Sequence, residues 1–497
     1  MPSVICSVMP SVMPSVIPSV IPSITTPTEL ETFIRRMAPA QMADLLLELS
    51  SDHEAVQKRL QRLMLANNPK RLAAGFRKSL TAWRRGKSFL GCREAREFGS
   101  ELEAWLGQIE RELLPRDPAG ALELAEVFVE SDAVFFNRAD DSDGAIGSAI
   151  RAGCRLWLKA ASACESPVEA WPARLDALAS ADEYGAREVL YQQAQELLSE
   201  TALRQLAHQH MARMGEALSK PTETGRMPAG VFSISSTLSL LARALRDPDI
   251  HVKAVLAYSP QPNAHQMEGF VRGYLDCGRP ADALPWLDKD WGHMQDTRQR
   301  LLAEVLGKLG QHAESAALLQ GVFEKTLSVY DLQTWIAALP PAEQSQAAAK
   351  ARELALRHPE PVPAALVLVE IGEHALAESA LLASPARING QDYSSLVPLA
   401  KSLEENERWA GATAVYRALL DAILNRAYAR AYGHAFRYWQ RLGVMDANGA
   451  DLGPLEMHEA YVAEVRRKHG RKVSFWAYVN GTREAETETT PEDDDGL

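Results

Sequence analysis

Turn-forming residues recur at a nearly constant interval in the second half of the chain, each between two helical patterns. Gly278, Gly310 and Gly372 stand in "LDCGRPADALPWL", "GKLGQHAESAALL" and "VEIGEHALAESALL", and Asn406 stands in "EENERWAGATAVYRALL". The intervals are 32, 62 and 34 residues, and the longest divides into two steps of about 31 at Pro341. Because Gly and Asn can end a helix in the left-handed conformation, the spacing predicts a turn between two helices at each position.

Alanine follows three of these turns at the same distance. Ala281, Ala313 and Ala375 each stand three residues after a glycine, and we expect them where two helices approach closely. A turn-and-alanine pattern with a period of about 34 residues is typical of tetratricopeptide repeats. Aromatic residues make up only 7% of the chain, and sequence rich in alanine and leucine favours helix over strand. The predicted fold class is all-α: a helical-hairpin, tetratricopeptide-like solenoid over residues 231–442.

The flanking segments differ in composition. Residues 28–230 are predicted to form an N-terminal helical region, which Thr28 and Glu31 can open as a capping box. Residues 1–27 repeat the motif P-S-V-(I/M) with a proline at every fourth position from Pro10 to Pro22, which forbids a helix and indicates a disordered, low-complexity leader. Residues 481–497 are acidic and poor in apolar residues, which predicts a disordered tail. Residues 443–480 would close the repeats as a C-terminal cap.

Two interpretations compete for the segment "RRKHGRKVSFWAYV", residues 466–479. Lysine and arginine beside aromatic rings can hold single-stranded nucleic acid. An open stack of repeats also needs a terminal element that covers its last apolar face, and large aromatic rings cover the most area. We favour the cap. The predicted cap residues are Tyr461, Phe475, Trp476 and Tyr478, and the basic residues on the exterior are Arg466, Arg467, Lys468, Arg471 and Lys472.

A second basic segment lies near the N-terminus. Residues 58–96 contain twelve Lys or Arg and a single acid, Glu94, although the whole chain has a net charge of −12. Leu72, Phe76, Leu80 and Trp83 form one helical stripe, so the cations can form a solvated face. The alternative is a patch for nucleic acid or an acidic partner, and the chain's own acidic tail is one such partner. The candidate residues are Lys70, Arg71, Arg77, Lys78, Arg84, Arg85 and Lys87.

No motif with complete catalytic or metal-binding spacing is present. "RADDSDGAIG" matches part of a calcium loop, but Ala139 and Ile150 stand where acids are required. We therefore expect Asp143 and Gly144 at a helix–helix turn, with Asp143 or Ser142 as the helix cap. Gly86-Lys87-Ser88 lacks the first glycine of a phosphate-binding loop. The sequence predicts no catalytic residue, no metal and no cofactor.

The cysteines and the hydropathy pattern indicate a cytoplasmic protein with no membrane partner. The five cysteines are scattered without any C-x-x-C pair, which is typical of single buried thiols in a reducing compartment. No run of eighteen apolar residues occurs, so no transmembrane helix is predicted.

Several segments carry a resemblance to a known family. "DLLLELSSDHEAVQKRL", "SFLGCREAREFGSELEAWL", "RADDSDGAIGSAI", "YLDCGRPADALPWLD" and "RRKHGRKVSFWAYV" resemble an uncharacterised bacterial family of all-helical proteins, itself similar to the repeat region of SWIM zinc-finger proteins. The resemblance covers residues 40–479 and implies a helical fold. SWIM proteins carry a C-x-C…C-x-H zinc module, which is absent from this sequence, so the resemblance implies no zinc function here.

The expected function follows from the architecture. Stacked helical hairpins form an extended groove, so we expect a non-enzymatic scaffold or adaptor that binds a protein partner on the concave face of its repeats. Nucleic-acid binding through residues 58–96 and 466–472 is the first alternative. An enzyme with an unrecognised site is the second.

Overall fold

The computed structural model describes residues 27–481, apart from 55, 58, 61–67, 166, 221–226, 448 and 450. The predictions for the leader, the acidic tail and part of the basic segment 58–96 lie outside these residues. The described residues form helices and no strand, with one isolated bridge between Leu90 and Ala139. The all-α class is therefore confirmed. Across the same ranges, every helix is too short or too polar to span a bilayer.

The chain divides into two compact units between Gln209 and His210. The sequence pattern placed the boundary at 230, after the loop rich in proline and glycine. The division falls inside one continuous helix, α11 (Glu200–Ser219), and not in that loop.

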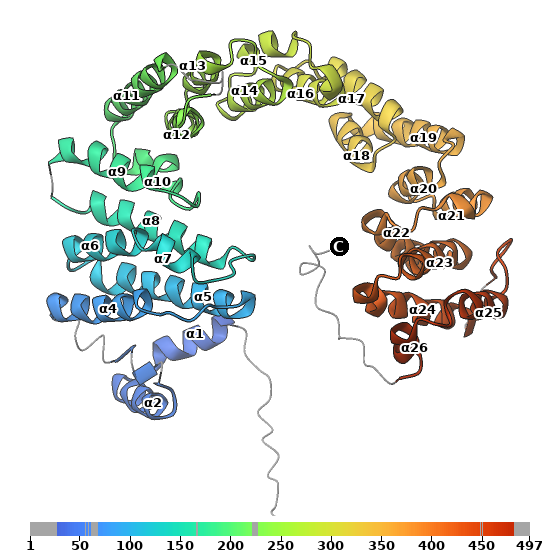
Figure 1. The fold of residues 1–497 in the computed structure, drawn as a ribbon, viewed down its shortest axis with the longest axis horizontal. Coiled ribbons are helices and arrows are strands. Elements are labelled where there is room, and N and C mark those ends of the chain that lie inside the picture. Colours follow the sequence, from blue (N-terminus) through green and yellow to red (C-terminus); the bar gives the residue numbers. More distant parts are fainter. Residues whose placement is uncertain are drawn as a thin grey trace, which may run out of the picture. The chain divides into compact units, whose positions relative to one another are not determined.

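The first unit is built around α8. Its eleven buried residues make α8 apolar on most sides, and it packs against α5, α6, α7 and α10. Figure 1 shows α4, α5, α6 and α8 lying side by side, and α4 packs against α6. The helices of this unit are α1 (Pro27–Arg36), α2 (Pro39–Asp52), α4 (Pro69–Arg84), α5 (Cys92–Gln108), η1 (Ile109–Leu113), α6 (Pro118–Val129), α7 (Asp132–Phe136), α8 (Ala145–Ser162), η2 (Val168–Ala170), α9 (Trp171–Ser180), α10 (Val189–Gln192) and η3 (Ala194–Glu196).

In the second unit, each helix packs mainly against the helices next to it in sequence. From α12 to α21 and from α22 to α24 every helix packs on its successor (Figure 1). In addition, α21 packs against α23 and α20 against α22. The helices are α12 (Val231–Ala244), α13 (Pro248–Tyr258), α14 (Ala264–Asp276), α15 (Pro280–Leu287), η4 (Gly292–Met294), α16 (Gln295–Lys308), α17 (His312–Thr326), α18 (Val329–Ala338), α19 (Pro341–Arg357), α20 (Pro361–Glu370), α21 (His374–Ala383), η5 (Pro385–Arg387), α22 (Tyr393–Glu405), α23 (Trp409–Arg426), η6 (Ala429–Ala431), α24 (Tyr432–Ala447), α25 (His458–His469) and α26 (Val473–Val479).

Five turns of the described second unit share one backbone pattern. They centre on Arg246, Gly278, Gly310, Gly372 and Glu407, which all have positive φ. At each turn, the N–H of the central residue bonds the carbonyl three residues back, and the next N–H bonds the carbonyl five residues before it, with N–O distances of 2.8 to 3.1 Å. This is the Schellman motif, which satisfies two carbonyls at the end of a helix. The next helix begins two residues after the turn centre in all five cases.

Two of the predicted turn centres are different in the structure. Asn406 has φ −103°, and the left-handed residue is its neighbour Glu407, at φ 57°. Pro341 is the first residue of α19, and the link before it is extended, with Leu339 at φ −91° and ψ 147°. A proline cannot take positive φ, so this link has no Schellman turn. Arg246 is a turn that the search for glycine missed.

The alanines that follow the turns do not lie at the helix contacts. Ala281, Ala313 and Ala375 are exposed, so their predicted role is wrong. The close contacts fall two residues later, at the buried residues Ala283, Ser315, Ala377 and Ala412, five positions after four of the turn centres. On the helix that follows each turn, the residues at the helix contact therefore lie about 200° around the axis from the positions that the pattern predicted.

Candidate binding surfaces

Helix α4 presents the predicted basic face to solvent. Pro69 opens the helix, and the Asn68 side chain accepts a hydrogen bond from the N–H of Arg71 at 3.2 Å. Its inner face buries Leu72, Ala73, Phe76 and Leu80, while Phe76 and Trp83 meet the Trp105 ring edge-on at 6.0 and 5.5 Å. This anchoring fixes which way the remaining side chains of α4 point.

The cations of α4 form two rows along the side opposite the buried stripe. Residues seven apart lie on almost the same line of a helix, and both rows repeat at that spacing. All of these residues are exposed. One row is Lys70, Arg77 and Arg84, and the other is Arg71, Lys78 and Arg85.

Few acids neutralise these rows. Arg77 pairs with Glu123 of α6 at 2.8 Å. Among the described residues, no ion pair is formed by the other five cations of the rows or by Lys87, which lies exposed in the loop after α4. A concentration of unpaired cations favours a polyanionic ligand.

The loop after α4 is fixed by the acidic turn that precedes α8. Leu90 N–H donates to the carbonyl of Arg138 at 2.8 Å, and Asp140 N–H donates to the carbonyl of Leu90 at 2.9 Å. A Cβ atom at Gly86 would lie only 1.8 Å from the Arg138 guanidinium. The segment Gly86-Lys87-Ser88 lies between two helices, whereas a phosphate-binding loop follows a strand.

The turn at residues 139–144 is a helix start. Asp141 accepts hydrogen bonds from the N–H groups of Ile146 and Gly147 at 2.7 and 3.0 Å, and Gly144 takes φ 69°. Asp141 is therefore the cap, and the prediction of Asp143 or Ser142 is wrong.

Asp143 instead bonds groups of α5. It accepts a hydrogen bond from the Cys92 thiol and one from Arg96 Nε at 2.8 Å, and these two donors hold the pKa of Asp143 below its usual value. No group of three or more potential metal ligands gathers anywhere in the described ranges.

The C-terminal basic segment is partly neutralised by its own helix. Arg467 Nε and Lys468 Nζ lie 2.6 and 3.1 Å from the carboxylate of Glu464, and their hydrogen bonds lower its pKa to about 2. The Arg466 guanidinium lies over the Trp476 ring, 4.9 Å from its centroid. Only Arg471 and Lys472 of the five predicted residues have no such partner among the described residues, so the charge available to a ligand is smaller than on α4.

The aromatic residues after this segment pack into the second unit. Phe475 is fully buried and Trp476 is 9% exposed, and the Trp476 indole donates to the carbonyl of His469 at 2.9 Å. Both rings meet Trp439 of α24 edge-on, and Tyr478 stacks on Phe436. Tyr461 is also buried and donates to Asp421 at 3.0 Å. The buried rings of Tyr461, Phe475 and Trp476 are therefore unavailable for stacking on bases.

A groove forms in the second unit where three links between helices meet. Its volume is about 500 Å³, and its apolar wall contains Leu327, Val329 and Leu366. Its polar rim includes Tyr330, which is 64% exposed, and Arg387, which donates to the carbonyl of Pro359 at 2.9 Å. An apolar wall with polar groups at the rim is typical of peptide-binding grooves.

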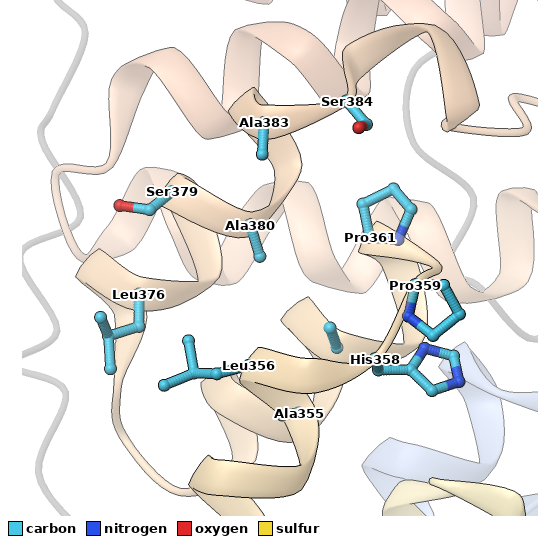
Figure 2. Close-up of a pocket in the computed structure, with 11 residues that line it drawn as sticks. Ala355, Leu356, His358, Pro359, Pro361, Leu376, Ser379, Ala380, Ala383 and Ser384 are labelled. Carbon is cyan, nitrogen blue, oxygen red and sulfur yellow. The ribbon is translucent and has the colours of Figure 1, made fainter.

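A smaller hollow of about 260 Å³ lies beside the α19–α20 link. Figure 2 shows its walls, with Leu356 of α19 facing Leu376 and Ala380 of α21. The Ser379 hydroxyl donates to the carbonyl of Ala375 in its own helix, and His358 Nδ1 accepts from the N–H of Glu360. These groups are engaged with nearby backbone and form no nucleophile–base pair.

Sequence reasoning missed the buried ion pairs. Arg187 and Asp132 are 5% and 2% exposed, yet both stand in segments that look like ordinary charged helix surface. Asp331 is likewise buried and accepts from Arg300 Nε at 2.6 Å. Cys154 is buried as expected, whereas Cys92, Cys164 and Cys277 are half-exposed, and Cys6 lies outside the described residues.

The described residues define an all-α protein. A model of the family of unknown function DUF6880 matches residues 31–478. The chain belongs to this family, and the expectation of an uncharacterised family is confirmed. No curated protein and no solved structure matches the chain.

Proposed function

We propose that the chain is a non-enzymatic helical-repeat scaffold that binds a protein partner. In this proposal residues 231–442 form tetratricopeptide-like hairpins stacked as a solenoid, and the segment that contains Phe475 and Trp476 caps the stack. The likeness to the repeat region of SWIM proteins and a cytoplasmic location belong to the same proposal.

One structural observation supports the proposed scaffold function most directly. Five Schellman turns join helix pairs in the same way, with the next helix always starting two residues after the turn centre. Repeated hairpins whose helices contact mainly their sequence neighbours generate extended binding surfaces. The groove beside Tyr330 adds a place for a partner, because it combines an apolar wall with a rim that offers Arg387 and Asp392.

The experiment compares two tagged variants with the wild-type chain by affinity capture and quantitative mass spectrometry. Tyr330→Ser changes the groove rim, and Phe232→Ser changes a ring of matched exposure, 63% against 64%, away from the groove. We expect a partner that is retained by wild type and Phe232→Ser and is lost by Tyr330→Ser. Identical capture by all three chains would contradict binding at this groove.

Nuclease treatment of the same samples separates protein binding from nucleic-acid binding. A partner bound directly by the groove survives the treatment. Loss of every captured protein on digestion would instead favour a nucleic-acid-binding function.

A further inference from the structure

We propose that the basic face of α4 binds the chain's own acidic segment, residues 482–497. The basic face comprises the unpaired cations Lys70, Arg71, Lys78, Arg84 and Arg85, with Lys87 in the loop that follows. The inference does not depend on the proposed scaffold function.

The face is built for charge and not for apolar contact. Ala74 and Thr81 lie between the two rows, and Gly75 and Ser79 lie beside the row of Arg71 and Lys78. No large apolar side chain of α4 is exposed. The sixteen residues of α4 extend about 24 Å along the axis. A ligand of this face must therefore be elongated, anionic and poor in apolar groups.

The segment 482–497 has these properties. Its sequence, "TREAETETTPEDDDGL", contains seven acids and one arginine, a net charge of −6, and its only apolar side chains are alanine, proline and a leucine. The six unpaired cations of the basic face carry the opposite charge of equal size. Sixteen residues can reach about 50 Å when extended, which is more than the length of α4.

The nearby acids leave the face open. Glu123 is paired with Arg77, Asp143 with Arg96, and Asp141 caps α8. These carboxylates are already engaged, so they do not compete strongly for the free cations. The whole chain is acidic, at −12, which disfavours the approach of a nucleic acid.

Binding of a labelled synthetic peptide of residues 482–497 tests the proposal. The receptor is the full chain in which the tail acids are replaced by their amides, so that the attached tail cannot compete. Fluorescence anisotropy should show binding that weakens steeply as salt rises from about 50 to about 200 mM, because the contacts are ionic. The wild-type chain should bind the peptide several-fold more weakly, because its own tail occupies the face.

Two sets of five substitutions in the amide-tail receptor locate the site. Changing five cations of the basic face to Gln should weaken peptide binding by about tenfold or more. The five are Lys70, Arg71, Lys78, Arg84 and Arg85. The matched control changes five exposed cations elsewhere, Arg155, Lys253, Lys289, Lys308 and Arg430, and should change binding by less than about twofold. Equal losses in the two sets would overturn the proposal. Thermal melts show that both variants are folded, since all ten side chains are exposed.

Carbodiimide cross-linking of the wild-type chain gives an independent readout. The proposal expects cross-links from Lys70, Lys78 or Lys87 to the acids of 482–497, and mixing light and heavy chains shows whether they form within one copy or between two. Absence of such cross-links would contradict binding of the acidic segment to α4. A single-stranded oligonucleotide that binds α4 equally in the wild-type and amide-tail chains would also overturn it, in favour of nucleic-acid binding.

Discussion

Arg187 forms a two-pronged ion pair with Asp132 inside the first unit, although the two residues lie 55 positions apart. Arg187 Nε and Nη2 each donate to one carboxylate oxygen of Asp132 at 2.7 Å, and Nη1 donates to the carbonyl of Leu178 at 2.9 Å. The pair joins the start of α7 to the loop before α10 and satisfies charges that are almost completely removed from water.

Removing one partner of this pair should be costly. Asp132→Ala leaves an unpaired guanidinium in the core, and we expect a loss of roughly 3–5 kcal/mol in the free energy of unfolding. Urea denaturation measures it. Glu97→Ala breaks the exposed pair with Arg93 and should cost less than about 0.5 kcal/mol. Replacing both buried partners with apolar residues should recover part of the loss, and equal effects of the two single variants would contradict this account.

Trp476 should contribute far more to stability than the charges beside it. Trp476→Ala removes a ring that is 9% exposed and should cost roughly 3–5 kcal/mol. Val473→Ala, at a position that is 77% exposed, is the matched truncation and should be within about 0.5 kcal/mol of wild type. Changing Arg466, Arg467, Lys468, Arg471 and Lys472 to Gln should have a small effect. A small loss for Trp476→Ala would mean that the ring does not close the core.

A side chain at a turn glycine should lower stability. Gly372 has φ 80°, and Gly372→Ala should lower stability by about 1–2 kcal/mol, because a Cβ atom disfavours the left-handed conformation. Gly321 lies exposed inside α17 with open space around it, so Gly321→Ala should raise stability by about 0.5–1 kcal/mol. The free energy of unfolding of both variants checks the prediction: it should fall for Gly372→Ala and rise for Gly321→Ala.

The second unit should lose stability in mild acid through His251. Its ring packs on Phe270 at 5.5 Å, and burial, followed by the charge of Arg243, lowers its pKa below the usual 6.5. As the pH falls, the unfolded chain binds the proton first. The stability contributed by the neutral ring is therefore present above about pH 6.5 and is lost as the pH falls through the lowered folded pKa.

The variant His251→Phe isolates this effect, since phenylalanine cannot bind a proton. Its urea midpoint should fall less than that of wild type between about pH 7.5 and about pH 5.5. His312→Phe, at an exposed position of α17, should keep the wild-type slope. If His251→Phe also kept that slope, another group would have to account for it.

The local patterns of the sequence predicted what depends on a few neighbouring residues. The apolar stripe of α4 was predicted from its spacing, and Leu72, Phe76 and Leu80 are buried. Gly278, Gly310 and Gly372 were predicted as turns, and all have positive φ, because the absence of Cβ makes glycine the easiest residue to place there. The same rule failed at Arg246 and Glu407, where the packing of two helices imposes a left-handed residue at some cost in energy.

The sequence by itself determined the all-α class, the basic face of α4 and the period of the turns, since helix propensity and amphipathic spacing are local properties. Only the tertiary structure decided which charges are buried, as with Arg187 and Asp132, and which small residues lie at helix contacts. It also decided that Arg467 and Lys468 share Glu464, while Arg77 is the cation of α4 that forms an ion pair among the described residues. Whether a charge is exposed, paired or buried depends on contacts between residues far apart in the chain, and one sequence carries no local signal of these contacts.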